Sequence, residues 1–150
     1  MTRSLPRTSL SLASACGALM ALALAPFGAQ AHERETIKPL FRQALPNVEG
    51  KSFTTIEVTF GPGVKALPHR HGQAFVYAYV LRGAVRSQLE GEPVKTYETG
   101  QSWFEPAGAH HVLTENVSDT TPATLLVTFV ADSAENLKVN DGGDGMDMHH

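Results

Sequence analysis

The chain has 150 residues, a formal net charge of −3 and a single cysteine, Cys16. This length suits one domain with a modest core, and the acidic balance argues against a nucleic-acid partner. The chain beyond Cys16 contains no cysteine, so a domain formed there has no disulfide and depends on packing for its stability.

The first 31 residues are interpreted as a cleaved secretory signal. Arg3 and Arg7 give a basic start, the run from 10 to 25 is apolar and uncharged, and Ala29-Gln30-Ala31 forms a small-x-small cleavage site. Cleavage there would make His32 the new N-terminus. We therefore expect a periplasmic or secreted protein.

Two other interpretations of this segment are less consistent with its residues. An uncleaved membrane anchor needs roughly 18 or more apolar residues, and this run is shorter. A lipoprotein processed at Cys16 usually has Leu where Ala13 stands. After cleavage, 119 residues with ten basic and fifteen acidic side chains would remain.

The pattern after the leader predicts strands. Residues 32–51 carry Pro39 and Pro46 and are interpreted as an N-terminal arm, with at most a short helix around 37–44. From Ser52 to Phe60 apolar and polar residues alternate with period two, which predicts a half-buried strand. Six more extended segments follow between turns that are mostly rich in glycine and proline, at 74–81, 84–90, 94–98, 101–105, 111–116 and 123–131. Seven closely spaced strands without a helix predict an all-β antiparallel sandwich or barrel over 52–132 and exclude a parallel α/β fold.

Residues 133–150 are predicted to form a disordered C-terminal tail. From Asn140 onward the tail is rich in Gly and Asp and cannot bury enough apolar surface to order itself. His149 and His150 at its end either bind metal or are only a polar ending.

Two histidine clusters, His69-Arg70-His71 and His110-His111, lie at the edges of predicted strands. Side chains alternate in an extended segment, so His69 and His71 point to the same face. A third histidine from another strand would complete one side of a metal site. By itself, an H-x-H pair favours the simpler interpretation of solvated or hydrogen-bonded side chains.

The spacing around these clusters resembles the two motifs of the cupin superfamily. The first motif is matched by Gly63, five residues, His69-x-His71, eleven residues and Gly83. The second is matched by Gly100, five residues, Pro106-x-Gly108, two residues and His111. The sixteen residues between the motifs fit the short spacing of microbial single-barrel cupins. The resemblance implies a small single-domain cupin with a jelly-roll β-barrel and one metal ion on His69, His71 and His111.

The chain departs from the family pattern at one ligand position. The first-motif Glu would fall at 76 or 75, where this chain has Val76 and Phe75, and Glu115 replaces the Asn of the second motif. Three neutral imidazoles leave a divalent ion its full charge, which favours hydroxide or an anionic substrate as the balancing partner. Octahedral Fe, Mn, Ni or Co and tetrahedral Zn all remain open as the metal.

Glu105 is the candidate catalytic residue. It shares a strand face with Trp103, so if Trp103 packs inside, Glu105 reaches the interior near His111. A buried carboxylate needs a cation, so Glu105 would be a fourth ligand or a base acting on bound water or substrate. The alternative is a solvated Glu at the barrel rim. His110, next to His111, is expected to face away from the site.

The resemblance implies a metal-dependent protein that acts on a small-molecule ligand or substrate, with oxidative, dioxygenase-like chemistry as the leading reaction class. A non-catalytic metal- or small-ligand-binding protein of the cell envelope is the main alternative. A third is a metal that only staples the barrel. We expect no nucleic-acid partner and no stable membrane anchor, and a homodimer remains open.

Overall fold

The computed structural model describes residues 35–143, and within this range the chain forms ten strands and no helix. The predicted leader, 1–31, lies outside the described residues, as do the tail residues from 144 onward. Among the described residues there is no helix long and apolar enough to cross a membrane.

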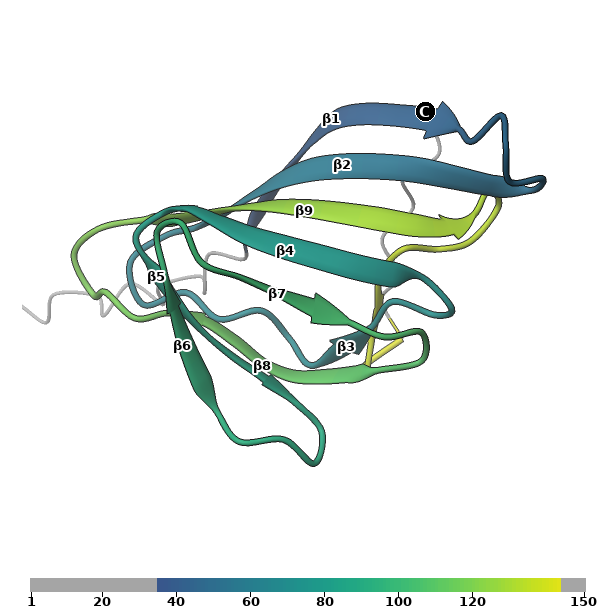
Figure 1. Ribbon diagram of the computed structural model, residues 1–150. Coiled ribbons are helices and arrows are strands. Elements are labelled where there is room, and N and C mark those ends of the chain that lie inside the picture. Colours follow the sequence, from purple (N-terminus) through teal and green to yellow (C-terminus); the bar gives the residue numbers. More distant parts are fainter. Residues whose placement is uncertain (1–34, 144–150) are drawn as a thin grey trace, which may run out of the picture.

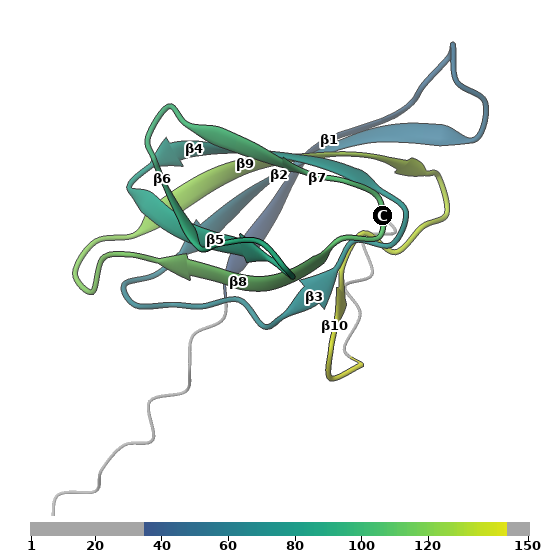
Figure 2. The same cartoon turned by 60° about the horizontal axis from the view of Figure 1, so that its bottom comes forward.

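Two five-stranded antiparallel sheets face each other (Figure 1), and Figure 2 shows them as two layers with β10 beside β3. The first sheet has the order β1 (Thr36–Ala44), β2 (Lys51–Phe60), β9 (Ala123–Asp132), β4 (Phe75–Arg82) and β7 (Ser102–Glu105). The second has the order β10 (Val139–Asn140), β3 (His69–Arg70), β8 (His110–Asn116), β5 (Ala84–Leu89) and β6 (Lys95–Glu98). This is the predicted all-β jelly-roll architecture.

The apolar core lies between the two sheets. In β2 the predicted alternation is present, because Thr54, Ile56, Val58 and Phe60 are buried and the residues between them are half-buried. β9 alternates in the same way against it. All seven predicted strands are confirmed, with shifts of a residue or two at their ends.

The predicted N-terminal arm is wrong in part, because residues 36–44 form strand β1 and no helix. β1 pairs with β2 from Thr36 opposite Thr59 to Ala44 opposite Ser52, with a bulge after Pro39. Proline lacks an N–H group, but an edge strand tolerates it where no ladder bond is required. Tertiary pairing with β2 therefore overrides the local signal of the proline.

The ordered fold also extends beyond the predicted limit at residue 132. Leu137 is 5% exposed and joins the core, and β10 pairs with β3 through Val139 opposite Arg70 and Asn140 opposite His69. The predicted disorder of 133–150 is therefore wrong for residues 133–143. One buried leucine and two ladder positions order a segment whose composition is otherwise polar. His149 and His150 lie outside the described residues.

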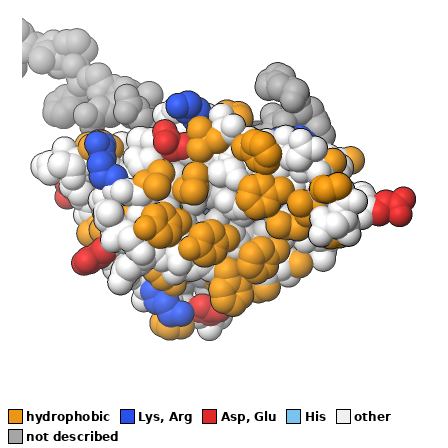
Figure 3. All heavy atoms as spheres, turned by 45° about the horizontal axis from the view of Figure 1, so that its top comes forward, with side chains coloured by type: hydrophobic (Ala, Val, Ile, Leu, Met, Phe, Trp, Pro, Cys, Tyr) orange, Lys and Arg blue, Asp and Glu red, His pale blue; other side chains and the backbone are white. Residues whose placement is uncertain are grey.

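The outer face of the first sheet is rich in apolar side chains (Figure 3). Strand pairing aligns Tyr77 with Phe104, and Phe75 stacks on Phe104 with ring centroids 6.0 Å apart. Phe41 packs edge-on against Phe53 at the other side of this face. The acidic and basic side chains seen in this view lie mainly at the rim.

Gly83 makes the tight connection between β4 and β5. It adopts a φ of 78°, and a Cβ added there would lie 3.0 Å from Cα of Ala123. Only glycine avoids both the left-handed strain and this contact. The turn predicted at this position is therefore confirmed, with a packing reason that the sequence did not reveal.

Candidate metal centre

The first two histidines enter the barrel from β3 and the residue that follows it. β3 is only two residues long, but it lies between β10 and β8, and His69 pairs directly with His111. His69 and His71 are both buried, whereas Arg70 between them is exposed. The expected common face of the H-x-H segment is therefore confirmed.

The third histidine arrives after the Pro106-Ala107-Gly108 turn at the start of β8. The pairing of β8 with β5 shifts register here, because Leu89 lies opposite His111 and Gln88 opposite Leu113. One extra residue in a strand reverses the alternation beyond it. As a result His111 and Thr114, three residues apart, both point into the barrel.

The three histidines converge on one point. Each of His69, His71 and His111 offers a ring nitrogen, and these atoms lie within 4.8 Å of one another. All three side chains are buried. The spacing fits a single ion, because imidazole nitrogens bind at about 2.0–2.1 Å from metals such as zinc.

Backbone carbonyls orient two of the rings. Nδ1 of His69 donates to the carbonyl of Leu67 at 2.7 Å, and Nδ1 of His71 donates to the carbonyl of Leu137 at 2.5 Å. A proton on Nδ1 leaves the Nε2 lone pair of both rings free to bind a metal. Leu137 thus has a second role, because its segment orients a candidate ligand.

His111 is held differently. Its Nε2 lies 2.8 Å from the hydroxyls of both Ser87 and Thr114. Its Nδ1 lies 3.0 Å from Oε1 of Glu105 but has no hydrogen-bond partner, so the contact has ion-pair distance without hydrogen-bond direction. The unpaired nitrogen is the atom that faces the carboxylate.

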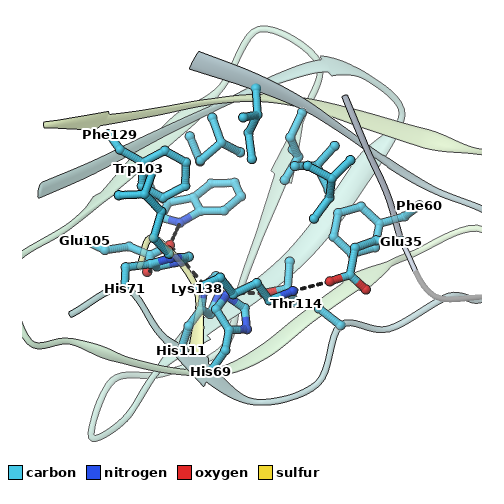
Figure 4. A pocket seen from close by; sticks show the side chains of 18 residues that line it. Glu35, Phe60, His69, His71, Trp103, Glu105, His111, Thr114, Phe129 and Lys138 are labelled. Carbon is cyan, nitrogen blue, oxygen red and sulfur yellow. Dashed lines mark hydrogen bonds and ion pairs between the residues drawn. The ribbon is translucent and has the colours of Figure 1, made fainter. Parts of the chain in front are cut away.

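Glu105 lies in the interior beside the histidines (Figure 4). The side chain is 2% exposed; Nε1 of Trp103 donates to Oε1 at 3.1 Å, and Oε2 lies 3.7 Å from Nε2 of His71. Ser102 and Phe104 point outward. The expected inward packing of Trp103 and Glu105 is therefore confirmed, and the rim position is not adopted.

Burial and neighbouring charges alter the ionisation of these groups. Burial lowers the pKa of His69 to about 3, and the adjacent His71 lowers it further. Burial likewise lowers the pKa of His71. For Glu105 burial acts the other way, but the interaction with His111 and the charge of His71 outweigh it and lower its pKa to about 2. At neutral pH the site therefore combines neutral His69 and His71 with an ionised carboxylate.

Two unpaired polar atoms show that this arrangement fits a cation. Oε2 of Glu105 and Nδ1 of His111 are buried without hydrogen-bond partners among the described residues. Leaving a buried charged group unpaired costs several kcal/mol, whereas a divalent ion would satisfy both atoms. Imidazole and carboxylate are the donor set that Fe, Mn, Co, Ni and Zn accept.

A cavity of about 60 Å³ opens beside the three histidines. Its far wall is apolar, with Ile56, Val58, Val127 and Phe129 from the first sheet. The polar side carries the histidines, Glu105, Thr114 and the ion pair of Lys138 with Glu35 (Figure 4). This volume holds a few water molecules or a small ligand.

His110 faces away from the centre, as expected. Its Nε2 lies 2.9 Å from Oδ2 of Asp141 and its Nδ1 lies 3.4 Å from Oε2 of Glu90. Glu115 also points away, because the bulge places it on the outer face between Lys65 and Arg86. Asn116 takes the inward position and donates through Nδ2 to the carbonyls of Gly61 and Thr121.

The comparisons with known proteins follow from this geometry. Residues 56–129 match the family model described as the cupin domain. This chain belongs to the cupin superfamily. No curated protein sequence matches it significantly.

Several solved structures share this cupin fold. DMSP lyase DddQ from Ruegeria pomeroyi DSS-3 aligns with a TM-score of 0.61 and 22% identity over 81% of this chain and 58% of that one. The protein TT1209 from Thermus thermophilus aligns with 0.53 and 28% over 64% and 82%. Oxalate oxidase in complex with glycolate aligns with 0.51 and 20% over 66% and 55%. This chain spans 41% to 55% of the oxalate oxidase chains that it matches.

Within this cupin, sequence reasoning missed four pocket residues. Ser87 and Thr114 hold His111, and only the bulge in β8, which the sequence does not announce, brings Thr114 inward. Glu35 and Lys138 lie in segments interpreted as an arm and a tail. The one available signal was the sequence Leu137-Lys138-Val139, an apolar pair in an otherwise polar stretch.

Proposed function

We propose that this cupin binds one divalent metal ion on His69, His71 and His111, with Glu105 beside it, and that the site converts a small molecule. The observation that carries the proposal is the buried carboxylate of Glu105, which stays ionised although Oε2 has no hydrogen-bond partner. A cation at the three imidazoles would supply the missing partner. Fe, Mn, Ni, Co and Zn are the candidate ions.

The proposed reaction class is oxidation of the substrate with dioxygen as the oxidant. A divalent ion bound here would polarise the substrate's oxygen atoms and, if redox-active, carry electrons between substrate and oxidant. The protein's own contribution is positional. Glu105 would accept a proton from the substrate at Oε2, Trp103 would hold that carboxylate in place through Oε1, and Phe129 with the aliphatic wall would exclude water.

The cavity favours this function over a purely structural metal. A staple site would be closed by protein on all sides, whereas here a space lined by all three histidines adjoins the centre. The second candidate function, binding without turnover in the cell envelope, shares that cavity. The two differ only in whether Glu105 moves a proton.

Metal analysis followed by oxygen-uptake measurements tests the proposal. Protein refolded separately with Fe, Mn, Ni, Co or Zn should retain one ion per chain, measured by plasma mass spectrometry. The loaded protein should then consume oxygen with some members of a panel of small phenols, diketones and enols. Ligand binding without oxygen uptake favours the binding protein, and the absence of any retained ion contradicts both.

Export is part of the proposal and rests on the sequence alone. The basic start, the uncharged apolar run and the Ala29-Gln30-Ala31 site together support a cleaved leader. The cysteine-free chain after the leader is compatible with an oxidising compartment.

The homodimer is proposed to form through the apolar outer face around Phe75, Tyr77 and Phe104. This face has few charges away from its rim, so a second copy can cover it without like-charge repulsion, whereas a charged partner would find no complement there. Light scattering should give twice the chain mass, and Phe104→Glu should give the monomer mass. Val94→Glu, a matched change at an exposed apolar residue of the second sheet, should leave the dimer intact.

A further inference from the structure

The pocket contains a buried ion pair that joins the two ends of the described chain. Lys138, just before β10, contacts Oε1 of Glu35, just before β1, and their side chains are only 10% and 9% exposed. Both residues line the cavity that adjoins the three histidines (Figure 4). Both also lie outside residues 56–129, the part that matches the cupin family model. The pair is therefore a property of this chain's own terminal segments.

Lys138 is the single Lys or Arg that lines this cavity among residues 35–143. Its ammonium lies within electrostatic range of the centre. Burial is the largest cause of the lowered pKa of both His69 and His71, and the positive charge of Lys138 adds to it in both cases. A divalent ion would add further positive charge to the same small space, with Glu35 and Glu105 as the opposing carboxylates.

Glu35 shows what kind of group Lys138 accepts. Its carboxylate enters the cavity from outside the barrel wall and is the ammonium's partner there. A buried ammonium keeps an anionic partner, because leaving it unpaired would be costly. A free carboxylate that enters the pocket can take over this role, since it offers the same oxygen atoms to the same cation.

We infer that the pocket takes a small carboxylate anion of acetate or propanoate size, and that Lys138 binds its carboxylate in exchange for Glu35. The short apolar part of such a molecule would lie against Val58, Val127 and Phe129. Glu35 thereby acts as a built-in competitor, and its release loosens the segment before β1 over the pocket. The inference deepens the proposed function and rests on it, since it names the substrate class of the same site.

Opposite effects of the two partners test the inference. Calorimetric titration with acetate and propanoate, and with acetamide and propanamide as neutral counterparts, is carried out on the folded protein with and without zinc. Lys138→Met should weaken binding of the carboxylates about tenfold or more, which is the loss of one charged hydrogen bond. Glu35→Gln should strengthen it, because the competing carboxylate is removed. The amides should bind weakly to all three proteins.

A double variant separates binding from stability. Glu35→Gln with Lys138→Met leaves no unpaired charge, so it should fold, as judged by circular dichroism, and should show no preference for carboxylate over amide. If Glu35→Gln instead weakened carboxylate binding as Lys138→Met does, the pair would only fix the terminal segments and the inference would be overturned. Equal binding of acetate and acetamide to the unaltered protein would also overturn it. Failure to retain zinc would contradict the proposed function, while the metal-free titration still decides the role of Lys138.

Discussion

Glu105 of β7 lies directly opposite Val76 of β4 in the antiparallel pair of these strands. Val76 stands where the cupin resemblance expects a glutamate, and it is buried on the inner face. Residues opposite each other in such a pair have Cβ atoms about 4.5–5.5 Å apart, so their side chains enter nearly the same space. The carboxylate that the first motif lacks is thus offered to the site from the neighbouring strand.

This relationship makes Glu105 necessary for metal affinity. Glu105→Gln keeps the shape and the bond to Trp103 but removes the charge, so we expect metal affinity to fall by about 10–100-fold. Competition with a chelating dye measures it. Glu98→Gln, a matched change at an exposed glutamate of β6, should have no effect.

Moving the carboxylate across the strand pair should restore the site. The double variant Val76→Glu with Glu105→Val is expected to recover most of the affinity that Glu105→Gln loses, because the group returns from the opposite position. If Glu105→Gln bound metal like the unaltered protein, the site would consist of the three histidines alone.

The histidines should differ sharply from their neighbour His110. Replacement of His69, His71 or His111 by Ala should abolish retention of the ion in metal analysis after dialysis, since each removes one of three converging donors. His110→Ala should retain the ion, because that ring contacts Asp141 and Glu90. Loss of metal in the His110 variant with retention in the His111 variant would show that the second motif was placed in the wrong register.

The metal-free protein should lose stability as the pH falls below about 6.5. The pKa of His69 is about 3 in the fold and 6.5 as its ordinary value, and that of Glu105 is about 2 against 4.5. Both groups bind more protons in the unfolded state, His69 between pH 6.5 and 3 and Glu105 between 4.5 and 2. Their stabilisation is complete above those upper limits and disappears as the pH falls, by on the order of several kcal/mol.

Urea unfolding of chelator-treated protein at a series of pH values checks this dependence. A His69→Leu variant should lose part of the pH dependence between pH 6.5 and 4.5, where Glu105 does not yet titrate. Constant stability of the unaltered protein from about pH 7 to 5 would contradict a neutral, buried His69.

The exported form should begin at His32. The reason is the Ala29-Gln30-Ala31 site after an uncharged apolar run, and mass spectrometry of protein from the periplasm or medium measures it. An Ala31→Glu change should block cleavage, because the site needs a small residue there. An intact N-terminus, or a lipid on Cys16, would contradict the prediction.

The sequence determined the strands, the fold and the three histidines because their signals are local. Period-two alternation in β2 reports which side of one strand is buried, and the spacing of His69, His71 and His111 with their flanking turns is a property of two short segments. The position of Glu105 on the Trp103 face also followed from alternation, once a large aromatic side chain was assumed to pack inside.

Only the tertiary structure decided which residues complete the pocket. β1 forms despite Pro39 because β2 offers it an edge, and residues 133–143 are ordered because Leu137 enters the core. Thr114 turns inward through a bulge whose origin lies in the pairing with β5. Glu35 and Lys138 are separated by more than a hundred residues and meet only because both ends of the barrel cross the same cavity. Such contacts depend on how strands pair across space, and no local periodicity encodes that pairing.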